Sequence, residues 1–139
     1  MITLPLELDR DTKREIERHY EVLTESTGDG QVGCTPEQLE RVVSVLLSHE
    51  VMWRCQLAHY ALALHRVVQD CDSELSVQVR PAVLAALTYL CNTDDVTPDY
   101  TLGAGFLDDA HVMNKCLRIV RRHSPETYRQ LLHTVEESC

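Results

Sequence analysis

A chain of 139 residues is long enough for one domain with a buried core. Lysine and arginine number 13 against 22 aspartates and glutamates, so the net charge is −9 and the pI is near 5.1. This acidic balance argues against sequence-independent nucleic-acid binding and against electrostatic docking on anionic lipid, because both need a basic surface. No run of about 18 apolar residues without charges occurs, so we predict no transmembrane segment.

The N-terminal residues 1–8 carry a strand-like alternation of apolar residues: Ile2, Leu4, Leu6 and Leu8. Pro5 interrupts the alternation, so we predict an extended arm that lies on the helices. A first helix follows, capped by Asp9 or Asp11 and ending at about Ser26. The glycine-rich segment after it matches neither a dinucleotide-binding motif nor a P-loop, and we interpret it as a linker.

Thr35 begins the next predicted helix, because its hydroxyl can cap, Pro36 suits the first helical position and Gln38 completes a capping box. Residues 51–68 are apolar on nearly every side, which predicts the central helix of a bundle. The sequence leaves open whether residues 36–70 form one helix or two.

An acidic connection separates two further predicted helices. The first begins at Arg80–Pro81 and ends near Leu90, where residues that favour caps and turns follow. The second begins at Asp108 or Asp109, either of which can cap it, and one apolar stripe runs along it: Met113, Cys116, Leu117 and Val120. Ser124 is the expected cap of a last helix over residues 125–137.

Five aspartates lie in or beside this connection: Asp94, Asp95, Asp99, Asp108 and Asp109. Oxygen ligands suit hard cations, and Asp108 and His111 are three residues apart and so share a helix face. One hypothesis is therefore a metal site at which Mg²⁺ or Mn²⁺ activates water, with these ligands: Asp95, Asp99, Asp108, Asp109 and His111. The simpler interpretation, which we prefer, is that the aspartates cap helices and brace the loop while His111 faces water.

The same connection carries an ordered motif: Tyr89-Leu90, then Asp95, Pro98-Asp99, Gly105 and Asp108-Asp109. On these residues, the segment from 80 to about 120 resembles the YkvA-like domain of unknown function, a short bacterial and archaeal module. Thr93 and Leu102 stand where that family has prolines. The resemblance implies a helix, a loop and a second helix, and it implies no reaction. Some relatives have loops apolar enough to enter a membrane, but this loop is more polar.

Six cysteines are scattered along the chain: Cys34, Cys55, Cys71, Cys91, Cys116 and Cys139. None belongs to a CxxC pair, so no zinc signature appears, and several fall in apolar helical runs where a free thiol packs as a small hydrophobe. With no signal-peptide pattern, this usage predicts free thiols in a reducing cytoplasm, with Cys139 exposed and reactive. His59 and His65 are six residues apart on the predicted central helix, so they do not form a ligand pair.

These patterns predict an all-α fold, a compact bundle of about five to six helices in a single domain over residues 1–139. Within it we distinguish an N-terminal helical extension (9–70), the YkvA-like core (80–120) and the C-terminal helix (125–137).

No nucleophile–base pair, phosphate loop or metal motif is legible, so we lean towards a non-enzymatic function. We predict a small cytoplasmic protein-interaction or regulatory module that binds a protein partner or forms a homo-oligomer, and that binds no nucleic acid. The alternatives are a divalent-metal-binding protein or metal-dependent hydrolase that uses the acidic segment 94–111, and a membrane-peripheral protein.

Overall fold

The structure is a computed structural model that describes residues 1–5, 7–26, 34–48, 50–71, 75–91 and 106–139. Over these residues it is all-helical, which confirms the predicted fold class. The helices are α1 (Arg10–Ser26), α2 (Pro36–Leu47), α3 (Met52–Cys71), α4 (Val79–Cys91), α5 (Leu107–His123) and α6 (Pro125–Ser138). Of the described part of the chain, no helix is both long and apolar enough to cross a membrane.

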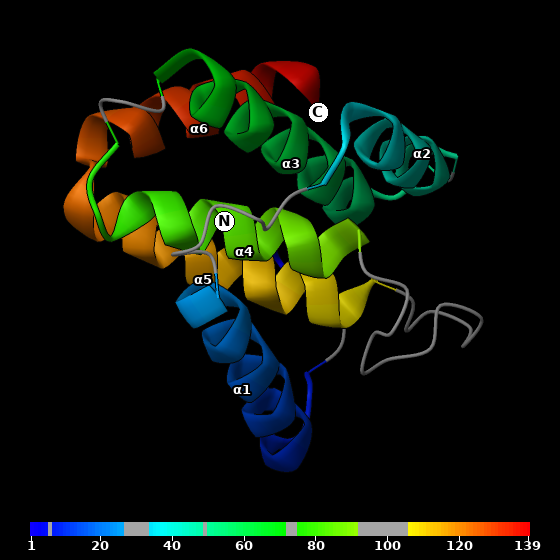
Figure 1. Cartoon of the computed structure of the whole chain (residues 1–139). Helices are drawn as coiled ribbons and strands as arrows, with labels where there is room; N and C mark the ends of the chain where they lie inside the picture. Colours follow the sequence, from blue (N-terminus) through cyan, green and yellow to red (C-terminus); the bar gives the residue numbers. More distant parts are fainter. Residues whose placement is uncertain (6, 27–33, 49, 72–74, 92–105) are drawn as a thin grey trace.

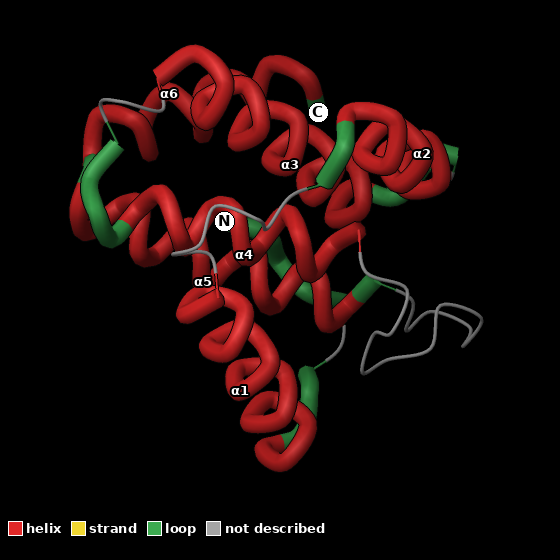
Figure 2. The backbone as a smooth tube through the Cα atoms, viewed as in Figure 1, coloured by secondary structure: helices red, strands yellow, loops and turns green. Residues whose placement is uncertain are grey.

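The helices pack around α4 and α5, which lie side by side at the centre of the bundle (Figure 1). Helices α3 and α6 pack against each other on one side of this pair, and α2 lies at the edge against α3. Helix α1 crosses the other side and contacts both α4 and α5 (Figure 2). This arrangement buries most of α4 and α5, whereas the other helices each keep a solvent face.

The first two helices begin as their sequences predict. The Asp9 carboxylate accepts a hydrogen bond from the backbone amide of Thr12 at 2.7 Å, so Asp9 is the cap of α1. Thr35 and Gln38 form the predicted capping box, in which each side chain accepts from the other residue's backbone amide. These caps depend on neighbouring residues alone, which is why the sequence is enough to predict them.

Residues 36–70 form two helices, because α2 ends at Leu47 and α3 begins at Met52. The expected central helix, residues 51–68, corresponds to α3, which contacts α2, α4, α5 and α6. Its buried apolar side chains are Trp53, Leu57, Ala58, Tyr60, Ala61 and Leu64. Met52 is exposed and His59 half-buried, so α3 covers the core on one broad face and shares the central role with α4 and α5.

The start of α5 differs from the predicted one. The N-cap is Phe106, not Asp108 or Asp109, and Phe106 has a left-handed backbone with φ of 70° and no side-chain capping bond. A positive φ is unusual for an aromatic residue. The Arg54 guanidinium of α3 lies over the Phe106 ring, 5.2 Å from its centroid, and the ring is buried. Packing against α3 therefore holds a backbone turn that residue preference alone does not predict.

The predicted cap of α6 is also wrong in its chemistry. Ser124 does occupy the cap position and Pro125 the first helical position, but the Ser124 side chain makes no capping hydrogen bond. Its backbone amide instead donates to the Val120 carbonyl at 2.7 Å, which ends α5. Ser124 thus belongs to both helices, and the turn between them leaves its hydroxyl out of the cap.

The N-terminal arm lies on α5, as the alternation predicts. The Asn114 side chain accepts from the Ile2 amide and donates to the Ile2 carbonyl, each at 2.9 Å. Ile2 itself is buried in the core, and Leu4 and Leu8 pack against that core. A single buried amide therefore satisfies both backbone groups of Ile2, in the way that a neighbouring strand does.

Two disulfides correct the prediction that the cysteines are free thiols. Cys34, just before α2, is joined to Cys91 at the end of α4, with Cα atoms 6.1 Å apart. Cys55 of α3 is joined to Cys139 after α6, with Cα atoms 6.3 Å apart. Both separations fall in the usual range for a disulfide. Each bridge joins helices that are distant in sequence, so spacing along the chain does not reveal the pairing.

Candidate functional site

The first turn of α5 carries the two described aspartates of the predicted metal site. Asp108 and Asp109 are both almost completely buried. The Tyr89 hydroxyl of α4 donates to an Asp108 carboxylate oxygen at 3.0 Å, and Tyr89 is buried too. The backbone amides and dipole at the start of α5 favour negative charge here. The acidic pair is therefore an internal feature and not a solvated surface, and Asp108 anchors α5 to α4.

His111, one turn further along α5, points to a different helix. Its Nε2 atom lies 3.3 Å from a Glu17 carboxylate oxygen on α1. Lys115 of α5 lies 3.9 Å from the other Glu17 oxygen and 3.7 Å from Glu21. The prediction that His111 faces water is wrong, because only 8% of its surface is exposed. His111 belongs instead to the polar contact between α1 and α5.

Burial lowers the pKa of His111 from its ordinary value, and the Glu17 carboxylate opposes this, while Arg118 and Lys13 add to it. The unfolded chain therefore binds a proton more readily than the folded one.

As pH falls below about 6.5, His111 should reduce the free energy of unfolding, and above that value it should not. Urea titrations at pH 7.5 and 5.5 should show a smaller loss in His111→Gln than in the wild type. The control is His133→Gln, which removes a histidine with an exposed side chain on α6. A wild-type slope in His111→Gln would contradict the prediction.

The structure divides the predicted ligand set. Asp108 contacts α4 through Tyr89, and His111 contacts α1 through Glu17. Asp95 and Asp99, and Asp94 beside them, lie outside the described residues. Among the residues that are described, the three-residue group of His, Cys, Asp or Glu with metal-ligand spacing lies elsewhere, at Cys55, His59 and Cys139. The metal site at the acidic segment thus stays a prediction.

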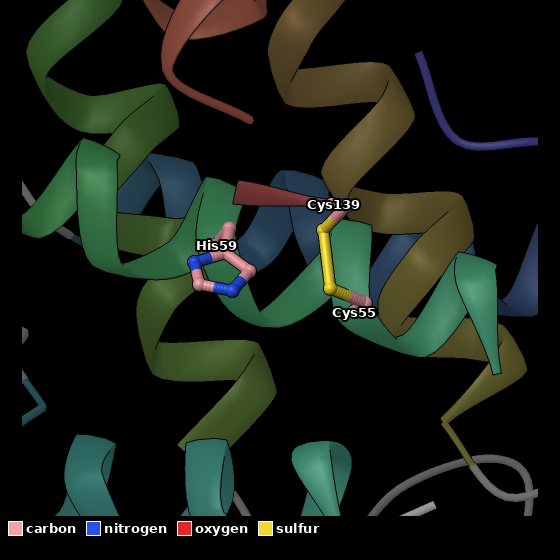
Figure 3. A group of neighbouring side chains, drawn as sticks. All are labelled: Cys55, His59 and Cys139. Carbon is pink, nitrogen blue, oxygen red and sulfur yellow. A yellow bond between two sulfur atoms is a disulfide. The ribbon is translucent and has the colours of Figure 1, made fainter. Parts of the chain in front are cut away.

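Cys55, His59 and Cys139 come together where the end of α6 meets α3 (Figure 3). One ligand atom from each residue lies within 4.8 Å of the other two, and the two sulfurs are joined as a disulfide. This group was not predicted from the sequence, where His59 was compared only with His65. The four-residue spacing of Cys55 and His59 on one helix face was a readable signal. Cys139 was not readable, because its place depends on the packing of α6 against α3.

Among the described residues, Cys116 of α5 is a free thiol and could in principle act as a nucleophile. Its side chain is fully buried. Burial raises the pKa of Cys116 to about 12, against a smaller lowering by the neighbouring Tyr20 hydroxyl. A thiol with so high a pKa carries almost no thiolate at neutral pH, and thiolate is the reactive form. Tyr20 in turn donates its hydroxyl hydrogen to the Ala82 carbonyl at 2.8 Å. We therefore assign Cys116 to packing between α1, α4 and α5.

Four exposed apolar side chains lie close together in the sequence, where α2 leads into α3. They are Val45, Leu47, Val51 and Met52, and we call them the α2–α3 apolar surface. Leu47 is 42% exposed and Met52 is 60% exposed, although large apolar side chains are usually buried. Two exposed acidic residues belong to the same stretch of the chain, Glu40 before the four apolar residues and Glu50 among them. An apolar patch with a charged rim is typical of a surface that binds another macromolecule.

Comparison of this chain with family models, with curated proteins and with solved structures finds no match. Functional assignment therefore rests on the chain's own residues and their geometry.

Proposed function

We propose that this chain is a helical protein-interaction module, and that it binds its partner through the α2–α3 apolar surface. The observation that carries the proposal is the exposure of four large apolar side chains within residues 45–52. Elsewhere in the described residues, the exposed large apolar side chains Val22 and Val77 stand on α1 and before α4, away from this segment of the chain. A concentration of this kind favours a binding surface over scattered exposure.

Charge indicates the kind of partner. Glu37, Glu40 and Glu50 are exposed in the same stretch of the chain, against Arg41, and the whole chain carries a net charge of −9. We infer that the partner is a protein segment whose apolar side chains are flanked by lysine or arginine, such as a basic amphipathic helix. The same acidic flank disfavours an anionic membrane and a symmetric contact with a second copy of the chain, because both place like charges together.

The test uses a charged substitution on the surface and a matched one elsewhere. Leu47→Glu/Met52→Glu should keep the melting temperature, since both side chains are exposed, and should weaken binding of a synthetic Leu- and Lys-rich helical peptide by about 100-fold. Val22→Glu, which changes an exposed apolar residue on α1, should bind as the wild type does. Fluorescence anisotropy of the labelled peptide measures all three proteins.

Capture from the native host with the same three proteins extends the test. The expected result is a partner held by the wild type and by Val22→Glu but lost with the double variant, through a segment rich in lysine or arginine. Equal binding and equal capture by all three proteins would overturn the proposal. Light scattering tests the remaining occupant. If the wild type and Val22→Glu form a concentration-dependent dimer and the double variant does not, a second copy of the chain occupies the surface instead.

We also propose that the chain is similar to the YkvA-like domain and that it resides in the cytoplasm. Similarity to the YkvA-like domain over residues 80–120 is supported by the end of α4 at Cys91 and the start of α5 at Leu107, which are the two helices that the resemblance implies. A cytoplasmic setting is tested by quenching cells in acid, unfolding the protein and then labelling its thiols, because a reducing compartment opens disulfides. Labelling of Cys34 and Cys91 in the unfolded protein, where burial no longer shields Cys34, would support that setting, and their protection would argue against it.

A divalent-cation site at the acidic segment is the second candidate function. The observation that favours it is the burial of two adjacent carboxylates, Asp108 and Asp109, next to the segment that contains Asp95 and Asp99. On this hypothesis Mg²⁺ or Mn²⁺ raises the melting temperature of the metal-stripped protein, by several degrees at about a hundred times the dissociation constant. Asp108→Asn should abolish that rise. Absence of a rise in the wild type would eliminate the candidate.

A further inference from the structure

The place where the end of α6 meets α3 brings together ligands that suit a soft metal ion. Cys55 and His59 are four residues apart on α3 and so share one face of the helix, and Cys139 reaches that face from the end of α6 (Figure 3). The two sulfurs and one imidazole nitrogen all lie within 4.8 Å of one another. In the structure the sulfurs form a disulfide, so the three ligands are assembled while two of them are bonded together.

The chemistry of the donor set selects the ion. Two thiolates and an imidazole suit Zn²⁺, whereas Mg²⁺ and Ca²⁺ prefer oxygen. Zinc binds sulfur at about 2.3 Å and nitrogen at about 2.0–2.1 Å, so tetrahedral geometry places neighbouring ligand atoms about 3.5–3.8 Å apart. Once the disulfide is open, side-chain rotation that separates the two sulfurs can reach this spacing without moving the helices. The three residues leave one coordination position for water.

The exposure of the bridge makes its reduction accessible. Cys139 is exposed and Cys55 is half-buried, whereas Cys34 of the other bridge is buried. A thiolate can attack only a sulfur that it can reach. A reducing dithiol supplies two electrons and two protons, becomes a disulfide itself, and leaves Cys55 and Cys139 as thiols. Binding of Zn²⁺ then releases both thiol protons to solvent, because the metal takes thiolates.

We propose that Cys55, His59 and Cys139 form a redox-gated zinc site, which is a disulfide when oxidised and binds one Zn²⁺ when reduced. Either state holds α6 against α3, first by a covalent bridge and then by shared ligands. The proposal is independent of the partner surface on α2 and α3, since it shares no residue with Val45, Leu47, Val51 or Met52.

The test titrates Zn²⁺ into the full-length protein, reduced by a dithiol and freed of it without oxygen, against a chromogenic zinc chelator. The reduced wild type should bind one equivalent, and the oxidised wild type none until dithiol is added. Cys55→Ser and Cys139→Ser should each weaken binding by more than about 100-fold, because even outer-shell partners are worth about 10–100-fold. His59→Gln should weaken it as well, whereas His65→Gln, on the same helix and also half-buried, should bind as the wild type does.

Cobalt substitution distinguishes these ligands from others on the chain. Co²⁺ in the reduced wild type should show thiolate-to-cobalt charge-transfer absorption and the strong visible bands of a tetrahedral site, and His59→Gln should shift the visible bands. Circular dichroism checks that each variant is helical, and Cys139→Ser alters an exposed position in case Cys55→Ser misfolds. Undiminished one-to-one binding in Cys139→Ser, as zinc held by Cys34 and Cys91 would give, overturns the proposal. So does a reduced wild type that binds no zinc.

Discussion

Replacing Cys34 and Cys91 with serine should lower the free energy of unfolding by about 4 kcal/mol under oxidising conditions. The bridge joins residues 57 positions apart, and closing a loop of that length removes roughly this much conformational entropy from the unfolded chain. It ties the start of α2 to the end of α4. Along the chain these two helices are separated by α3. Urea denaturation of the oxidised wild type and of the double variant measures the difference.

The control for this prediction is built into the chain. With a dithiol present, neither protein has a disulfide, so the two denaturation curves should converge. The urea dependence of the free energy should also rise in the oxidised double variant, because the unfolded state without this bridge exposes more surface. Equal stability of the two oxidised proteins would show that the Cys34–Cys91 bridge contributes nothing.

Replacing Asp108 with alanine should lower the free energy of unfolding by up to about 3 kcal/mol. The change removes the buried acceptor of the Tyr89 hydroxyl, and losing one partner of a buried hydrogen bond costs roughly 1–3 kcal/mol. Asp108→Asn should cost less, because it keeps an oxygen that can accept from Tyr89. Thermal or urea unfolding at pH 7 measures both variants.

Two comparisons identify the origin of that loss. Asp11 also lies in the first turn of its helix but is exposed, so Asp11→Ala should change stability far less than Asp108→Ala. In a double-mutant cycle, Tyr89→Phe should cost less in an Asp108→Ala background than in the wild type, because the hydrogen bond is already gone. Additive losses would contradict an energetic link between Tyr89 and Asp108.

Features set by neighbouring residues could be predicted from the sequence. The Thr35–Gln38 capping box needs only residues three apart, and the stripe from Met113 to Val120 needs only helical periodicity. Both are present in the structure. The end of the helix before the acidic segment also follows, since α4 ends at Cys91, next to the predicted Leu90.

Features set by tertiary contacts could not be predicted. Aspartate is the better cap by residue type, yet Phe106 caps α5 because Arg54 of α3 packs on its ring. The sequence indicates that Asp108 and His111 share a face, but their partners Tyr89 and Glu17 come from two other helices. The disulfides join cysteines 57 and 84 positions apart, so no local pattern marks them.

The contact between Asn114 and Ile2 has a consequence for how the protein behaves at high concentration. Asn114 binds only backbone atoms, so it cannot distinguish the arm of its own chain from the arm of an identical molecule. Covalent attachment favours the contact within one chain. The short segment 3–9 joins Ile2 to α1, so the effective concentration of Ile2 at Asn114 is on the order of millimolar. Below that concentration we expect the arm to close on its own chain, and only near it do we expect two molecules to exchange arms.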